Sequence, residues 1–595
     1  MNARRVVAFV AFLSLAVYPV YAQRTGGGSR GAGPTSGGPR AVPNPTYQNT
    51  PFLTSPSVQH ASDEPRVEFK SETVLVEVPV IVTDKSGNHV QGLSRTDFEI
   101  LEAGKEQKIS SFEEIQTTRA LLSPSPARAG EYRNDGASGD APRSLTIIAL
   151  DTINTPYLDQ SYGRKQLLRY LADNVQAGQS IGLIAITSRG VKVIHNLSSN
   201  PAELTEALKK VKGDLPLLEG VDIDTRAAAA TGADLDPASA ASFPLGSTAV
   251  NLEDFVTQGD AAIARMQQDR AIEATVKAFL EVAWSLSGIP GKKSLIWATG
   301  GFPFFMDTPS AVPGGYLSIL YERAVQALND AEISVYPIDV RGLVNYYPNA
   351  DASQRGARLN NSYTQSLSAR SWLETTTLDT LKDFAEMTGG RAFYNTNDLT
   401  TSFARAADDA ADYYLLTNYL DTRNTKPGWR PLKVKVHRPG TEVRARSGFF
   451  ITNATVNPTL AHQTDMTLAL TSPFESTGIP LAVHWKNTAT EGEKKEVQFG
   501  LHVAPEGVTI EGERNLVNLD IAVVALRSKT GVAADTVSQT LEGPTSADTL
   551  TKLRADGLTY NNTLRLPAGQ YTVRFVVRDN PSGKVGSVTA PLTVN

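Results

Sequence analysis

SLTIIAL at residues 144–150 and SIGLIAITS at residues 180–188 are short, uninterrupted apolar runs. Such runs are typical of parallel β-strands that are covered on both faces. An amphipathic stretch separates them, and the alternation continues with SLIWAT at residues 294–299 and ISVYPIDV at residues 333–340. Repeated strand–helix units predict an α/β fold with a doubly wound, Rossmann-like parallel sheet over residues 143–405.

The segments between these strands carry further signals. Asn200 and Pro201 suit the N-cap and the first position of a helix. The Ala-, Gly- and Asp-rich stretch at residues 214–260 interrupts the alternation, so we interpret it as an insertion. RAFYN at residues 391–395 predicts one more short strand.

Patterns typical of β-structure flank the α/β region. VLVEVPVIVTD at residues 74–84 alternates apolar and polar side chains, and residues 66–115 are interpreted as an N-terminal β module. Residues 412–455 carry similar runs, and we hypothesise that they complete that module, because neither piece alone has enough strands to be stable. This hypothesis requires the α/β domain to be inserted within a β domain. Residues 463–595 lack a helical period and carry regular strands, which predicts an immunoglobulin-like β-sandwich, whereas residues 115–142 are interpreted as a loop.

The first residues predict export. Arg4 and Arg5 precede the apolar run VVAFVAFLSLAVYPV, and small residues follow it, which is typical of a secretory signal peptide over residues 1–22. A membrane anchor is the alternative, but the run contains Pro19 and is shorter than the roughly 20 residues that a spanning helix needs. Residues 23–65 are rich in Gly, Ser and Pro and predict a disordered linker.

The composition narrows the function further. The 595 residues include no cysteine and carry a formal charge of -5. The lack of cysteine excludes thiol catalysis, disulfides, cysteine-ligated metal sites and lipoprotein processing. The charge argues against a nucleic-acid partner. Because no stretch after the signal peptide is apolar for long enough to span a bilayer, we expect a mature chain without a transmembrane helix, in the periplasm or outside the cell.

Six motifs occur in an order that is itself specific. They are the run from Val76 to Glu114, LTIIALDTINT, GKKSLIWATGGFPF, ISVYPIDVRGL, EMTGGRAFYNTNDL and VKVHRPGTEVRARSGFF. Together they resemble the acidobacterial von Willebrand factor type A-related proteins over roughly residues 66–450. The resemblance implies a von Willebrand factor type A-like doubly wound domain, in which the carboxyl ends of the strands often bind a divalent cation. An Asp-x-Ser-x-Ser loop, a Thr from a second loop and an Asp from a third surround that cation.

This chain departs from the family's ligand pattern. Asp151 and Thr155 match the first and last positions of the first loop, but Ile153 replaces the middle hydroxyl. The third loop should carry an Asp, yet the strand SLIWA runs into the sequence Thr-Gly-Gly at residues 299–301. We therefore expect a degenerate metal-ion-dependent adhesion site, with Asp151 and Thr155 as its recognisable ligands. We therefore expect either no cofactor or a bound Mg²⁺ or Ca²⁺ ion.

Two questions about this loop stay open. Thr225 and Thr231 are both candidates for the threonine of the second loop. Asp151 has an alternative role, since a short acidic side chain after a strand often caps the next helix or accepts hydrogen bonds from loop amides. If the loop follows the family's geometry, the side chain of Asn154 points away from the site.

Enzymatic motifs do not hold in this sequence. GKKS at residues 291–294 resembles a phosphate-binding loop, but Leu286 occupies the place of the required glycine. The histidines are scattered without an H-E-x-x-H pair. We expect an exported, non-enzymatic binding or scaffold protein that contacts a protein or envelope partner, by analogy with the fold. The alternatives are a functional Mg²⁺- or Ca²⁺-dependent adhesion module and a hydrolase with an unrecognised site.

Overall fold

The computed structural model describes much of the chain after residue 72. The described residues are 73–116, 130–134, 145–175, 179–213, 216, 252–302, 316–343, 377–409, 412–421, 428–451, 458–491, 494–510 and 515–595. All of them belong to one compact unit, residues 71–595. The predicted signal peptide, the linker, Thr225 and Thr231 lie outside the described residues. Within these ranges, each helix is too short or too polar to cross a membrane.

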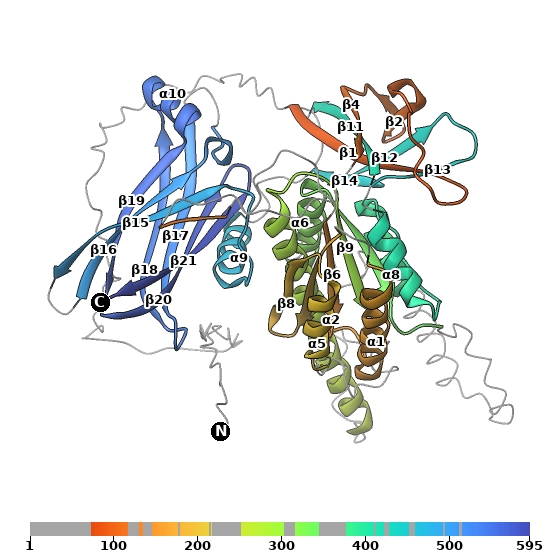
Figure 1. Cartoon of the computed structure of the whole chain (residues 1–595), viewed down its shortest axis with the longest axis horizontal. Helices are drawn as coiled ribbons and strands as arrows, with labels where there is room; N and C mark the ends of the chain where they lie inside the picture. The colour runs from red at the N-terminus through yellow and green to blue at the C-terminus, as the bar shows by residue number, and fades with distance from the viewer. Residues whose placement is uncertain are drawn as a thin grey trace, which may run out of the picture. The chain divides into compact units, whose positions relative to one another are not determined.

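The central sheet has five strands in the order β10-β9-β6-β7-β8 (Figure 1). Four of them are parallel: β6 (Leu145–Asp151), β7 (Ser180–Thr187), β9 (Lys293–Thr299) and β10 (Ile333–Asp339). The fifth strand, β8 (Gly190–Ser198), has no counterpart among the predicted strands, and it pairs antiparallel with β7. Thr187 pairs directly with Gly190, and a turn this short can join only antiparallel strands.

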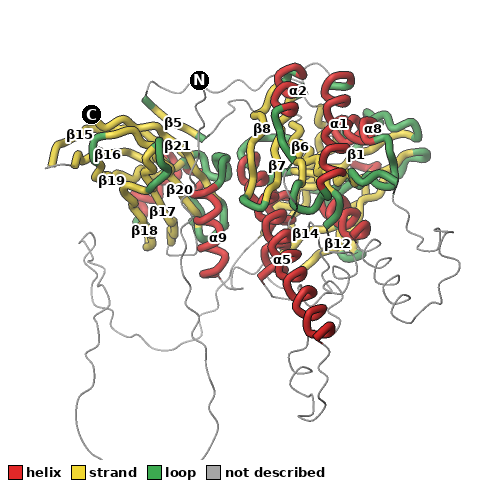
Figure 2. The backbone as a smooth tube through the Cα atoms, turned by 90° about the horizontal axis from the view of Figure 1, so that it is seen from below, coloured by secondary structure: helices red, strands yellow, loops and turns green. Residues whose placement is uncertain are grey.

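Helices cover both faces of this sheet (Figure 2). One face carries α5 (Leu252–Leu286), α6 (Tyr316–Asp330) and a helix over residues 377–388. The other carries α1 (Tyr157–Asp173), α2 (Pro201–Lys209) and α8 (Leu399–Asp408). The predicted start of α2 is confirmed, since the side chain of Asn200 accepts a hydrogen bond from the amide of Ala202. α5 begins inside the stretch that was predicted to be an insertion.

The predicted strand RAFYN forms only a single bridge, between Phe393 and Ile338 of β10. Gly390 lets this segment approach β10 closely, because a Cβ there would lie 1.9 Å from the carbonyl oxygen of Val335. Asn395 then adopts a φ of 53°, which ends the extended conformation. We call residues 390–396 the edge segment.

The β module consists of two four-stranded sheets, in the orders β13-β1-β11-β4 and β14-β12-β2-β3. Its N-terminal strands are β1 (Thr73–Asp84), β2 (Phe98–Glu102), β3 (Lys105–Gln107) and β4 (Ser111–Gln116), with a short 3-10 turn at Arg95–Asp97. The later strands are β11 (Asp412–Asp421), β12 (Gly428–Val436), β13 (Thr441–Arg444) and β14 (Gly448–Ile451). β11 pairs with β1 and β4, and β12 pairs with β2. The α/β domain is therefore inserted between two halves of one β module.

The C-terminal part packs two antiparallel sheets face to face, in the orders β19-β16-β15-β5 and β18-β17-β20-β21. The strands are β15 (Leu481–Glu491), β16 (Lys494–Val503), β17 (Leu516–Arg527), β18 (Ala533–Pro544), β19 (Leu558–Leu566), β20 (Gly569–Asp579) and β21 (Val585–Val594). The coarse prediction of an α/β region combined with β domains is thus confirmed.

Helices also occur here, against the prediction of strands alone: α9 (Pro458–Thr471) and α10 (Ala547–Asp556), with a 3-10 turn at Pro505–Gly507. Leu553 is the one residue that α10 buries, and a single buried position produces no helical period in the sequence.

β5 (Glu131–Arg133) corrects the interpretation of residues 115–142 as a loop. It pairs antiparallel with β15 as an edge strand of the C-terminal part. Asn134, which is 2% exposed, fixes its end: its side chain donates to the carbonyls of Ser476 and Ile479 and accepts from the amide of Leu481. A strand of three residues is too short to show a period in the sequence.

Candidate functional site

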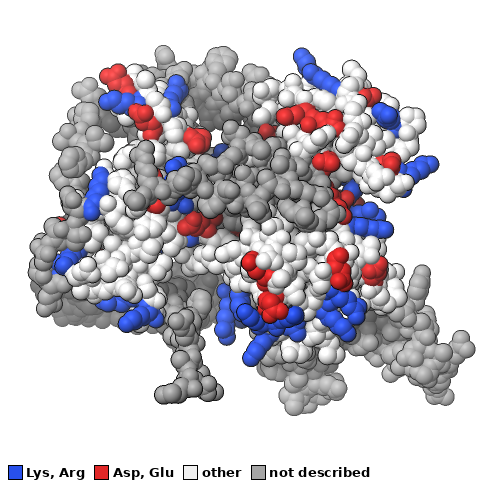
Figure 3. Space-filling view, in the orientation of Figure 1, with Lys and Arg blue, Asp and Glu red and all other residues white. Residues whose placement is uncertain are grey.

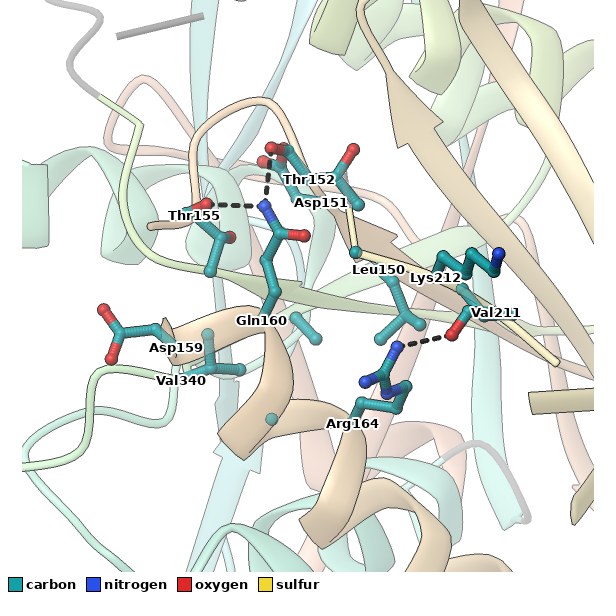
Figure 4. A pocket seen from close by; sticks show the side chains of 13 residues that line it. Leu150, Asp151, Thr152, Thr155, Asp159, Gln160, Arg164, Val211, Lys212 and Val340 are labelled. Atoms are coloured by element: carbon teal, nitrogen blue, oxygen red, sulfur yellow. Dashed lines mark hydrogen bonds between the residues drawn. The ribbon is translucent and has the colours of Figure 1, made fainter. Parts of the chain in front are cut away.

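The candidate site lies where two neighbouring parallel strands end. Asp151 is the last residue of β6, and Thr299 is the last residue of β9. The loop from Asp151 to Thr155 connects β6 to α1 and borders a small pocket (Figure 4). Ligands of open α/β sheets usually bind at this end of the strands.

The carboxylate of Asp151 accepts hydrogen bonds from groups within the protein, and Asp151 is only 2% exposed. Oδ1 accepts hydrogen bonds from the backbone amides of Ile153 and Asn154, both at 3.0 Å. Oδ2 accepts from Asn154 Nδ2 at 2.8 Å, Trp297 Nε1 at 3.0 Å and Thr299 Oγ1 at 2.9 Å. Burial raises the pKa of Asp151 above its ordinary value, and the hydrogen bonds from Asn154, Thr299 and Trp297 oppose that rise.

Thr155 holds a different part of the site. Its hydroxyl accepts a hydrogen bond from the amide of Gly300 at 2.8 Å, and its carbonyl accepts one from Gln160 Nε2 at 2.9 Å. Thr155 therefore joins the loop after β6 to the loop after β9. The two predicted ligands share one loop, and each already has partners within the protein.

Asn154 contradicts the expectation that its side chain points away. Its amide nitrogen bridges Asp151 Oδ2 and Thr275 Oγ1, at 2.8 and 2.9 Å. Thr275 belongs to α5, so this bridge connects the loop to a helix that covers the same face of the sheet as α6. The alternative role of Asp151 as an acceptor for loop amides is confirmed, whereas α1 begins after Pro156 and is not capped by Asp151.

This arrangement does not fit a divalent cation. Mg²⁺ and Ca²⁺ need several oxygen ligands whose lone pairs are directed at the ion. Oδ2 of Asp151 already accepts three donors, and the indole N–H of Trp297 has no lone pair to offer a metal. Among the described residues, no three His, Asp or Glu side chains are grouped so that they could hold an ion.

The pocket beside the loop is too small for a substrate. Its volume is about 30 Å³, which has room for about two water molecules. Beyond the loop from Asp151 to Thr155, its polar lining comes from Asp159, Gln160, Arg164 and Lys212. The Arg164 guanidinium is bound to the carbonyl of Val211 (Figure 4). Burial raises the pKa of Asp159, against the attraction of Arg341.

Exposed apolar and cationic side chains lie on segments at this end of the sheet, and we call them the rim surface; of these, Lys212 also lines the pocket. Leu158 and Leu343 are 80% and 63% exposed, and Arg189, Lys210 and Lys212 are exposed as well. Arg189 follows the end of β7, and Lys210 and Lys212 follow the end of α2. Figure 3 shows Lys and Arg gathered at this end of the α/β domain, around α1 and α2.

No protein-family model matches the chain, and no curated protein matches it.

Proposed function

We propose that the chain is an exported, non-enzymatic binding or scaffold protein of the von Willebrand factor type A-related kind. In this proposal, residues 143–405 form the type A-like domain and residues 463–595 form an immunoglobulin-like sandwich. The mostly parallel central sheet, which helices cover on both faces, supports the first assignment because it is doubly wound. The hydroxyl of Tyr571, which donates to the carbonyl of Pro567 four residues upstream, supports the second as a tyrosine corner.

One observation carries the proposed mode of binding. The carboxylate of Asp151 is filled by donors from β9 and from its own loop, at the place where a type A-like domain would hold a cation. Binding at this end of the sheet then depends on the rim surface and needs no metal. Leu158 and Leu343 offer apolar contacts, and Arg189, Lys210 and Lys212 favour a partner with acidic groups.

The absence of a cation requirement is directly testable. Calorimetric titration of the full chain with Mg²⁺ and with Ca²⁺ is expected to give no binding heat, because accepting an ion would cost the hydrogen bonds from Trp297 and Thr299. The thermal midpoint is expected to be the same with either ion and with a chelator. A measurable affinity that Asp151→Asn abolishes would replace this proposal with the cation-dependent adhesion module.

The rim surface is tested by capture from envelope extracts. A double variant, Leu158→Asp with Lys212→Glu, is expected to recover its partner about tenfold less well than the wild type. Both positions are exposed, so folding should be preserved. Lys529→Glu, in an exposed turn of the C-terminal part, is the matched control and should leave recovery unchanged. Equal recovery by all three proteins would contradict binding at the rim surface.

A further inference from the structure

A second, much larger hollow lies along the free edge of the α/β sheet, and we call it the edge groove. Its volume is about 650 Å³. One wall is the helix over residues 377–388, the other is α8, and the edge segment forms the floor. Arg444 of β13 also lines the groove. The edge groove shares no lining residue with the pocket beside Asp151.

The floor of the edge groove presents an unused strand edge. The amide of Phe393 donates to the carbonyl of Pro337 at 2.8 Å, and its carbonyl accepts from the amide of Asp339 at 2.9 Å. In a parallel pair, alternate residues direct their amides and carbonyls to opposite sides of the strand. This alternation directs the backbone groups of Ala392 and Tyr394 away from β10, and both residues line the groove. Within the described part of the chain, they have no backbone partner.

The edge segment is held in place before any ligand arrives. Gly390 packs directly on the backbone of Val335, where a Cβ would collide with the carbonyl oxygen at 1.9 Å. The side chain of Phe393 is 9% exposed and packs in the core beneath α8. A fixed strand edge loses little conformational entropy when another strand pairs with it.

Cationic side chains outnumber acidic ones around the groove. Its lining includes Lys382, Arg391, Arg405 and Arg444 against the carboxylates of Glu386 and Asp398.

Some of these charges already have a role in the fold. Arg444 is paired with Asp409, and the carboxylate of Asp398 caps α8 by accepting the amide of Thr401. Arg391 lies over the ring of Phe393, 5.7 Å from its centroid, and is exposed. Arg405 is exposed too, so both side chains can meet a ligand at the floor of the groove.

From this edge and this charge we infer that the groove binds an extended acidic peptide segment, which adds as a further strand beside residues 391–394. Backbone hydrogen bonds to Ala392 and Tyr394 would fix its register, and Arg391 and Arg405 would select carboxylate side chains. The positive charge alone could attract any anion, but the unpaired backbone groups of a strand edge form hydrogen bonds with a peptide backbone. The site is independent of the rim surface and does not rest on the proposed function.

The test uses the full chain and a panel of acetylated, amidated heptapeptides in which Glu alternates with Val, Leu or Phe. Fluorescence anisotropy is expected to show binding of the acidic peptides and none of the same peptides with Lys in place of Glu. Two N-methylated versions of each peptide are compared, one methylated at the odd-numbered amides and one at the even-numbered amides. Only one version is expected to bind, because alternate amides of a strand point to opposite sides and only one set faces the strand edge.

A double variant, Arg391→Glu with Arg405→Glu, is expected to lower the affinity for the tightest-binding acidic peptide by about tenfold or more. The matched control, Lys529→Glu with Lys552→Glu, reverses two exposed lysines of the C-terminal part and should bind as the wild type does. Unchanged circular dichroism and thermal midpoint would show that both variants are folded. Failure of every acidic peptide to bind overturns the inference. Equal binding by the two N-methylated versions, or full displacement of the peptide by inorganic phosphate, overturns the inference in favour of a simple anion site.

Discussion

Replacing Asp465 by alanine is expected to lower the free energy of unfolding by about 3–5 kcal/mol. Asp465 lies on α9 and its side chain is 0% exposed. It accepts hydrogen bonds from Arg323 of α6 and, at 2.9 Å, from Nε of Arg578 on β20. The side chains of these arginines are only 19% and 10% exposed. Without the carboxylate, two largely buried cations would lie side by side with no counter-charge.

Urea unfolding of the wild type and the variant measures this loss. Glu496→Ala is a suitable control, because Glu496 pairs at 3.0 Å with an Arg565 side chain that is 66% exposed, and such a pair contributes less than about 1 kcal/mol. A triple variant, Arg323→Met with Asp465→Leu and Arg578→Met, should lose less than Asp465→Ala alone, since it removes all three charges together. Equal losses for Asp465→Ala and Glu496→Ala would contradict the argument.

The free energy of unfolding is expected to rise as the pH increases from 7 to about 9.5, and Lys292→Met is expected to remove a large part of that rise and to leave the part that Lys293 contributes. Lys292 is 1% exposed, and its ammonium donates to the hydroxyl of Tyr336 at 3.0 Å and to the carbonyl of Asp409 at 3.3 Å. Burial lowers the pKa of Lys292 from 10.5 to about 7, against the attraction of Asp409. Burial likewise lowers the pKa of Lys293 to about 8.

The sign follows from the protons bound by each state. Between the folded pKa of about 7 and the unfolded pKa of 10.5, the unfolded chain keeps the proton that folded Lys292 has released. Stability therefore increases with pH across this window, by an amount on the order of 2–4 kcal/mol for a shift of this size. A buried acid acts at lower pH and in the opposite sense: burial raises the pKa of Glu281 to about 7.

Guanidinium unfolding at several pH values between 7 and 9.5 tests the prediction. Lys529→Met changes an exposed lysine and is expected to keep the wild-type slope of stability against pH. The prediction fails if Lys292→Met keeps that slope as well.

The sequence located the parallel strands well because burial on both faces leaves a plain apolar run. All seven residues of β9 and of β10 are buried, and both strands start within one residue of their predicted positions. The same reasoning missed β5 and α10, since β5 has three residues and α10 buries only Leu553. Neither leaves a periodic pattern, and the partner of β5 lies about 350 residues further along the chain.

The candidate site was predictable only in part. The sequence placed Asp151 and Thr155 in the loop after a strand and showed that the third-loop carboxylate is absent. It did not reveal that Trp297 and Thr299 donate to Asp151, because those bonds depend on how β6 and β9 are aligned. Thr275 was missed for the same reason, since the position of α5 over the loop is a tertiary property.

The route of the chain through β5 limits how this architecture can be recombined. Residues 130–134 lie before the α/β domain in the sequence but belong to the C-terminal sheet. A gene fragment that starts at residue 463 would produce a sandwich whose β15 edge is bare. The carbonyls of Ser476 and Ile479 and the amide of Leu481 would lose the side chain of Asn134. Transfer of this sandwich to another protein would therefore need a second, separate piece of the gene to travel with it.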